Sequence, residues 1–410
     1  VFAHLFEHLM FQGSENVAED MFFKYLDRAG ASEHNGSTNS DRTNYHETVP
    51  SNQLERALCL ESDRMGTLLD HVDEKTFESQ REVVLNERRQ NYENAPYGLV
   101  HQFVAAALFP PDHPYHLLTI GSPEDLGAAT LDDVRAFFKT YYVPNNATLV
   151  IAGDFEPKAT RALVEKYFAS IPRAADPPTK RTPIPVALKG EQRLDVEADV
   201  ELPKLIIAWP TPPFYAPGDA ELDATANVLA GDSRSSRLYK RLVYDLQVAQ
   251  DVSAGQASSL LGSEFEINVT LKKNGKREDV LKMVDEELDK LRKTEPTGDE
   301  VDRARTNMTS SIVYRMETMT DRADVLNDFA DYTHDPGYIG KDLARYEALT
   351  PAALKNAVTT WLPKDKRVVT FVRPTKGAHR EAQRIPELLG ESVDTYPRWH
   401  LTRRMIASEE

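Results

Sequence analysis

Hydrophobic residues dominate the start of the chain. Residues 1–11 are apolar at every position except three, which predicts a buried helix rather than one with a broad solvated face. Further along, β-rich stretches predict strands over 43–49 and 148–152, and helical periodicity runs from 53 to 69 and from 74 to about 92. Helices that alternate with short strands in this way predict an α+β fold.

A repeat appears when two helix-proline-strand units are aligned. The unit formed by residues 138–144 and 148–150 is laid on residues 361–363 and 367–369 at an offset of 219 residues, counted from Pro144 to Pro363 (363 − 144 = 219). The same offset carries the first helix onto residues 223–231, which keep its apolar pattern. We therefore expect two homologous tandem domains that share one fold.

The boundary between these domains is predicted from composition. Residues 172–193 are rich in Pro, Lys and Thr, as a linker is, so the domains become 1–171 and 194–376, followed by a C-terminal tail, 377–410. A length of 410 residues exceeds what one hydrophobic core usually serves. Because the chain opens at the first helix itself, we expect further strands of the first domain upstream of residue 1.

Bulk composition narrows the class of protein. The formal net charge of −16 argues against nucleic acid or an anionic membrane surface as a partner. No apolar stretch approaches the roughly 18 residues of a membrane span. Cys59 is the only cysteine, which excludes disulfides within the chain and argues against a thiolate metal site.

The three polar positions of the first helix carry the candidate chemistry. His4 and His8 are four residues apart and therefore share one helical surface, with Glu7 beside them. A catalytic zinc takes three protein ligands and a water, so two imidazoles need a third ligand from elsewhere, and Glu7 remains available as the base for that water. A chance cluster on an amphipathic helix is the alternative, but ionisable groups among apolar neighbours need partners or a metal. The order His-x-x-Glu-His is the inverzincin signature.

A second predicted helix offers the third ligand. Residues 80–89 contain two candidate carboxylates, Glu82 and Glu87. The pattern of apolar positions does not choose between them.

Three segments together resemble the pitrilysin/insulinase family of zinc peptidases: residues 4–11, residues 83–87, and residues 145–154. The resemblance spans most of residues 1–375. It implies one half of a clam-shell peptidase, in which each tandem domain is a mainly antiparallel sheet with helices packed on it. It also implies one Zn²⁺ per chain held by His4, His8 and Glu87, with Glu7 as the general base and Glu82 as a solvated neighbour.

The resemblance extends to two further positions. Many members carry a glutamate seven residues before the third ligand, around the metal site, where this chain has Gln80. The stretch that begins Asn35, Gly36, Ser37 and Thr38 is similar to the edge strand that pairs with an extended substrate through main-chain hydrogen bonds. Composition alone would also allow a Gly-Ser turn there.

One departure from the family concerns substrate binding. Members with a complete site carry an arginine and, seven residues later, a tyrosine after a Ser-Arg-Leu stretch. Here that stretch is present at 236–238, but the matching positions are Val243 and Gln250, whereas Arg241 and Tyr244 are out of register. We therefore expect a homologous second subunit, or a C-terminal half of a longer polypeptide, to supply the Arg/Tyr pair.

These patterns predict a zinc-dependent endopeptidase that cleaves peptides or unfolded segments inside an enclosed chamber. The alternative is a noncatalytic structural or peptide-binding subunit of the same fold. Under the 219-residue offset, His4, Glu7 and His8 become Asp223, Ala226 and Asn227, so the second domain is expected to lack metal ligands.

Overall fold

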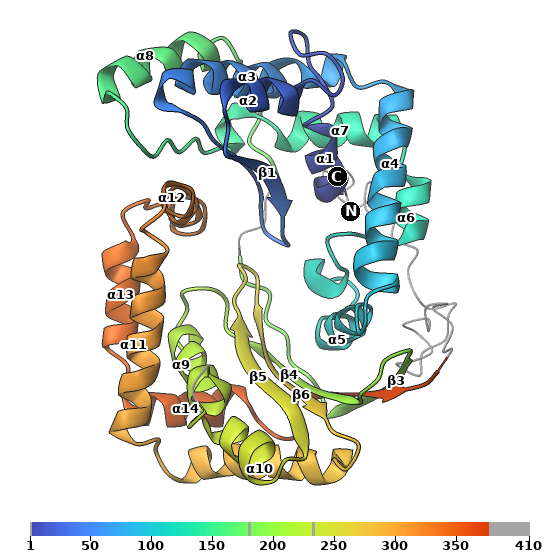
Figure 1. Cartoon of the computed structure of the whole chain (residues 1–410), viewed down its shortest axis with the longest axis vertical. Coiled ribbons are helices and arrows are strands. Elements are labelled where there is room, and N and C mark those ends of the chain that lie inside the picture. The colour runs from blue at the N-terminus through green and yellow to red at the C-terminus, as the bar shows by residue number, and fades with distance from the viewer. Residues whose placement is uncertain (1, 179–181, 232–233, 377–410) are drawn as a thin grey trace.

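The computed structural model describes residues 2–178, 182–231 and 234–376 (Figure 1). The first repeat contains helices α1 Phe2–Leu9, α2 Phe22–Ala29, α3 Leu54–Thr67, α4 Glu74–Arg88, α5 Val100–Leu108, α6 Pro123–Ala128, α7 Leu131–Tyr141 and α8 Pro157–Phe168, and strands β1 Glu33–Thr38 and β2 Thr43–Thr48. The second repeat contains strands β3 Gln192–Ala198, β4 Lys204–Thr211, β5 Ala249–Ala257, β6 Ser263–Leu271 and β7 Val368–Pro374, and helices α9 Asp219–Ala230, α10 Arg277–Lys293, α11 Gly298–Tyr314, α12 Met319–Thr333, α13 Ile339–Glu347 and α14 Pro351–Trp361. Short turns of 3-10 or π-helix join several of them, including η3 Arg89–Glu93, η4 Pro114–His116 and η6 Tyr239–Asp245.

The duplication predicted from the sequence is visible in the order of elements. Adding 219 carries α1 onto α9, the β1–β2 hairpin onto β5–β6, α4 onto α11 and α7 onto α14. Strand pairing is mainly antiparallel: the second repeat has a five-stranded sheet in the order β3-β7-β4-β6-β5, in which only β3 and β7 run parallel. The expected α+β fold with two homologous repeats is therefore confirmed.

Strand β4 shows how the two repeats are joined. Its side chains alternate between the two faces of the sheet, as the period of two requires. Leu205, Ile207 and Trp209 pack into the core under α9, α10 and α14, whereas Ile206 and Ala208 pack on the opposite face against α5 of the first repeat. A strand that is apolar on both faces is expected when both faces are covered.

The prediction of a strand over 148–152 is wrong. These residues have no regular secondary structure, although their counterparts in the second repeat form β7. Strand β7 is held between β3 and β4, but in the first repeat the described strands are the β1–β2 pair alone, and they pair only with each other. An extended segment without a hydrogen-bonded neighbour is not a strand, whatever its β propensity.

Other predicted segments are observed or lie outside the structure. The helices expected over 53–69 and 74–92 and the strand over 43–49 are confirmed as α3, α4 with η3, and β2. The described residues between 172 and 191 form no helix or strand, and the division into domains there stays a prediction. The predicted tail, 377–410, lies outside the described residues. None of the described helices is both long enough and apolar enough to cross a membrane.

Candidate metal centre

Helix α1 presents His4 and His8 because its other side is anchored in the core. Leu5, Phe6 and Leu9 are almost completely buried beneath α1, while both imidazoles are partly exposed. The ring centroids lie 4.9 Å apart with an interplanar angle of 83°. The helical spacing therefore places the two imidazoles on one side of α1, as the sequence predicted.

Helix α4 supplies the carboxylate. It starts after Asp73, whose side chain accepts a hydrogen bond of 2.8 Å from the backbone N–H of Thr76, as an N-cap does. Gln80, Val84 and Glu87 lie along one stripe of this helix, with Gln80 and Val84 buried. Glu82 is exposed and Glu87 is partly buried, so burial separates the two carboxylates that the apolar pattern left open, in favour of the one that the resemblance implied.

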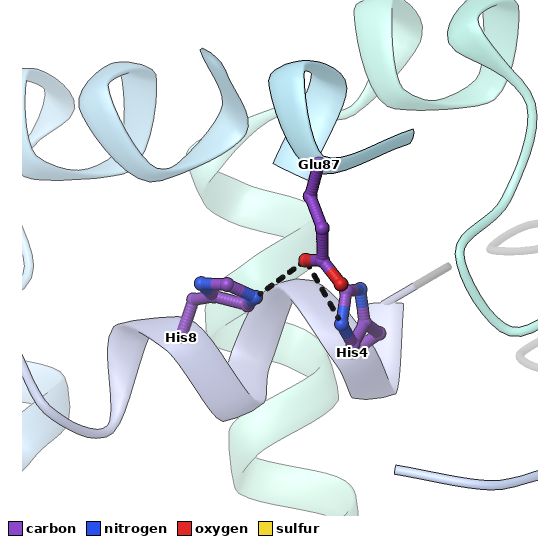
Figure 2. A group of neighbouring side chains, drawn as sticks. All are labelled: His4, His8 and Glu87. Carbon is purple, nitrogen blue, oxygen red and sulfur yellow. Dashed lines mark ion pairs between the residues drawn. The ribbon is translucent and has the colours of Figure 1, made fainter. Parts of the chain in front are cut away.

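The three side chains point toward one another, two from α1 and one from α4 (Figure 2). Glu87 Oε2 lies 3.5 Å from His4 Nε2 and 3.3 Å from His8 Nε2. Metal bonds of 2.0–2.2 Å in a tetrahedron separate neighbouring ligands by about 3.3–3.6 Å. The distances from Glu87 to the two imidazoles therefore suit a zinc ion better than a direct charged hydrogen bond, which would be about 2.7–2.9 Å.

The electrostatics of His4 agree with a role as a ligand. Burial and the neighbouring His8 lower the pKa of His4 to about 4, so its imidazole is neutral near pH 7. A neutral imidazole is the form that binds a metal. His4 Nε2 is the ring nitrogen that faces Glu87. The other ring nitrogen, His4 Nδ1, is buried and has no hydrogen-bond partner among the described residues.

Glu7 lies beside this group but is bound differently. It is buried and accepts a hydrogen bond of 2.5 Å from Thr38 Oγ1 at its Oε2 atom. Burial raises the pKa of Glu7, and the bond from Thr38 partly opposes that rise. Gly36 lies close above the carboxylate, since a Cβ atom at that position would be 3.1 Å from Glu7 Oε1. A carboxylate held in this way is suited to accept a proton.

The residues predicted to bind substrate form β1, so the expected strand is observed in place of a Gly-Ser turn. Asn35 and Ser37 are exposed, whereas Gly36 and Thr38 point toward Glu7. In the described structure β1 pairs on one side only, with β2. Sequence reasoning missed the bond from Thr38 to Glu7, although strand alternation indicates that Gly36 and Thr38 share a face.

Comparison with known proteins identifies the family to which this fold belongs. Residues 2–116 match the sequence profile described as insulinase (peptidase family M16), and residues 128–308 match the one described as the peptidase M16 inactive domain. The zinc protease PqqE of Helicobacter pylori is 30% identical over 337 residues, which is 80% of this chain and 73% of that protein. The chain belongs to peptidase family M16, the pitrilysin/insulinase family.

Other similar proteins differ in length from this chain. The insulin-degrading enzyme-like protein 2 of Arabidopsis thaliana is 26% identical over 291 residues, which is 66% of this chain but 28% of that protein. A crystal structure of a protease from Helicobacter pylori superimposes with a TM-score of 0.82 at 27% identity, covering 91% of this chain and 89% of that one. The periplasmic protease PqqL of Escherichia coli shares the fold at a TM-score of 0.74 and 14% identity, with 100% of this chain covering 46% of that chain.

The positions at which the resemblance led us to expect an Arg/Tyr pair hold Val243 and Gln250. Val243 lies in η6 and packs against the hydrophobic core of the second repeat, and Gln250 is exposed on β5. Arg241 is already engaged, since its guanidinium contacts Glu286 and lies 2.8 Å from Glu287 on α10. Positions 243 and 250, where the pair was expected, therefore carry neither an arginine nor a tyrosine.

The second repeat keeps the M16 scaffold without its ligands. On α9, the counterparts of His4, Glu7 and His8 are Asp223, Ala226 and Asn227, and on α11 the counterpart of Glu87 is Thr306 (87 + 219 = 306). Asp223 accepts a hydrogen bond of 2.8 Å from the Tyr346 hydroxyl, and burial raises the pKa of Asp223 to about 7. Asp223, the one acidic residue among these four positions, is therefore hydrogen-bonded within the second repeat.

A second group of possible ligands, His101, Glu264 and Glu266, lies where α5 meets β6. His101 is 3.6 Å from Glu264 and 3.8 Å from Glu266. The Glu266 carboxylate beside it raises the pKa of His101 to about 9, so this imidazole is positively charged near pH 7. In the structure this group forms an ion-pair cluster that joins the two repeats.

Proposed function

We propose that this chain is the zinc-binding half of an M16 endopeptidase. The observation that carries the proposal is the convergence of His4, His8 and Glu87 from two helices, with the buried carboxylate of Glu7 beside them. In this proposal the three converging side chains hold one Zn²⁺, and Glu7 acts as the general base.

The residues of the site suggest how hydrolysis would proceed. A zinc ion, when bound, supplies a Lewis acid for the scissile carbonyl and increases the acidity of the attacking water. Glu7 accepts a proton from that water and passes it to the leaving amine. Thr38 keeps the Glu7 carboxylate in one orientation, and burial brings the pKa of Glu7 closer to the range in which a base works near neutral pH.

Substrate binding is proposed at the edge of β1 that has no partner strand among the described residues. An extended peptide can add there as a further strand, with Asn35, Gly36, Ser37 and Thr38 supplying the backbone for pairing. Main-chain pairing is independent of side chains, which suits peptides or unfolded segments as substrates. Gln80, buried on the Glu87 stripe, would offer hydrogen bonds around the metal without the charge of a glutamate.

A partner half is part of this proposal. Because Val243 and Gln250 replace the Arg/Tyr pair, we propose that a homologous second half donates these groups and closes a chamber over the site. The coverage of 46% of PqqL, against 100% of this chain, supports the idea of a half. The partner half would be a separate subunit or a further part of the same polypeptide.

The test is Glu7→Gln in the assembled peptidase. We expect the variant to keep about one zinc per chain by elemental analysis and to lose about 10²–10⁴-fold in cleavage of an unstructured, fluorescence-quenched peptide, the range for losing a general base. Glu82→Gln is the matched control, because Glu82 is an exposed acid on α4, and it should behave as wild type.

Two results would contradict the proposal. Unchanged hydrolysis in Glu7→Gln would remove Glu7 as the base. Zinc binding without hydrolysis by wild type, with every homologous partner half supplied, would instead identify the chain as a noncatalytic peptide-binding or structural subunit.

A further inference from the structure

The hairpin β1–β2 needs support from outside itself. It is the whole of its sheet in the described structure, and an isolated two-stranded hairpin is at best marginally stable in water. Ten of its twelve strand residues are polar, the exceptions being Gly36 and Tyr45. Its own side chains therefore bring little hydrophobic burial to hold the proposed substrate edge in place.

Helix α12 of the second repeat contacts the hairpin along one of its own faces. Thr320, Asp324 and Asp328 are spaced four residues apart and so lie in one row on α12. Figure 1 shows α12 at the end of the second repeat that faces the β1–β2 hairpin of the first repeat. We call this row of three residues the α12 row.

Each member of the α12 row meets a hairpin side chain. Asp328 Oδ1 accepts from Arg42 Nε at 3.1 Å, and Asp324 Oδ1 accepts from Asn44 Nδ2 at 3.1 Å. At the far end, the hydroxyl of Thr320 lies 3.0 Å from Thr48 Oγ1 and 3.1 Å from Glu33 Oε2.

The turn of the hairpin is held by the second repeat as well. The Asp41 carboxylate accepts hydrogen bonds from the Tyr115 hydroxyl and, at 2.9 Å, from the backbone N–H of Leu260. The backbone N–H of Leu261 donates to the same Tyr115 oxygen at 2.9 Å. The hairpin is thus held along β2 by α12 and at its tip by the loop before β6.

These contacts continue to the catalytic carboxylate. Asn44 is buried, and its Oδ1 accepts a hydrogen bond of 2.5 Å from Ser37 Oγ on β1. The next residue, Thr38, donates to Glu7. A chain of contacts therefore runs from Asp324 through Asn44 and Ser37 to the strand that covers Glu7.

We propose that the second repeat, which lacks the metal ligands, positions the substrate-pairing edge of β1 through the α12 row. This inference rests on the proposed function and assigns a task to the repeat that lost its ligands. Thr320, Asp324 and Asp328 are positioning residues. Asp324 and Asp328 act on the hairpin through Asn44 and Arg42, and Thr320 acts on it through Thr48 and Glu33.

The experiment uses the assembled peptidase, with zinc bound and Glu7→Gln in this chain as background, so that peptide is bound without turnover. Asp324→Ala together with Asp328→Ala is expected to weaken binding of an extended, unstructured, fluorescently labelled peptide by about 10-fold or more, measured by anisotropy. Amide hydrogen exchange over β1 should accelerate in the same variant, since local opening sets the exchange rate. Zinc affinity should stay within about twofold of the background protein, because an outer-shell change at the metal would cost about 10-fold or more.

Two comparisons separate positioning from general destabilisation. Asp302→Ala is the matched control: this acid on α11 pairs with Arg305 of its own helix, and its loss should leave peptide binding and β1 exchange unchanged. Exchanging the charges, Arg42→Asp with Asp328→Arg, should restore much of the affinity that Asp328→Ala loses alone.

Peptide affinity and β1 exchange equal to those of Asp302→Ala would overturn the inference, as would failure of the exchanged pair to recover any affinity. If the background protein binds no peptide at all, the proposed function fails. Hydrogen exchange over β1 then still decides whether the α12 row holds the strand.

Discussion

Replacing Thr38 with valine should shift the pH dependence of hydrolysis. The substitution keeps the shape of the side chain and removes the hydroxyl that donates to Glu7 Oε2 at 2.5 Å. Glu7 must be ionised to accept a proton, so activity falls at acidic pH as this carboxylate becomes protonated. Burial already raises the pKa of Glu7, and the Thr38 bond lowers it. Without that bond the pKa rises further, and the acidic limb of the rate profile moves to higher pH.

The size of the shift follows from the strength of one charged hydrogen bond. Such bonds contribute about 1.5–3 kcal/mol, and about 1.4 kcal/mol corresponds to one pH unit, so the limb should move by roughly one to two pH units. Glu7 is 8% exposed and its hydrogen bond from Thr38 is partly buried, so solvent screens this bond only in part. The loss of rate should be large on the acidic limb and small on the plateau above it.

The assay is kcat/KM for an unstructured peptide measured across pH with the assembled peptidase, together with zinc content at each pH. Thr38→Ser is the matched control because it keeps a hydroxyl at the same position, and its profile should follow wild type. An acidic limb that stays at the wild-type pH in Thr38→Val would refute the reasoning, as would an equal shift in Thr38→Ser.

Three further predictions follow from the geometry. Glu87→Gln should lower zinc affinity by more than the roughly 10–100-fold of an outer-shell change, whereas Glu82→Gln should leave it unchanged in a competition titration with a chromophoric chelator. Gly36→Ala should keep zinc but reduce kcat by about 10-fold, because the added Cβ would be 3.1 Å from Glu7 Cγ and would displace the carboxylate by a few tenths of an ångström; an unchanged kcat would contradict this. Asp223, with its folded-state pKa near 7, binds a proton in the folded chain that the unfolded chain has released, so the free energy of unfolding should fall by up to about 1.4 kcal/mol per pH unit as pH rises from about 4 to about 7. In Asp223→Asn, the free energy of unfolding measured by urea denaturation should not show this decrease with pH. The same pH dependence in the variant and in wild type would contradict the assignment.

Local sequence patterns predicted much of the fold and part of the candidate metal site. The spacing of His4 and His8 predicted a shared helical surface because helical geometry is fixed within a few residues. The 219-residue offset predicted a duplicated architecture, since equal apolar patterns form equal elements. The expected strand at 148–152 failed, because pairing of a strand depends on neighbours distant in the chain.

Residues 4–8 by themselves determined the candidate chemistry of this protein, because a helix brings positions four apart together whatever surrounds it. The apolar pattern left Glu82 and Glu87 open, the family resemblance implied Glu87, and the tertiary structure shows Glu87 facing the two imidazoles. Only the tertiary structure decided that Thr38 bonds Glu7 and that α12 reaches the hairpin. Those contacts join segments tens to hundreds of residues apart, and such pairs are selected by packing and burial in the folded chain rather than by any local pattern.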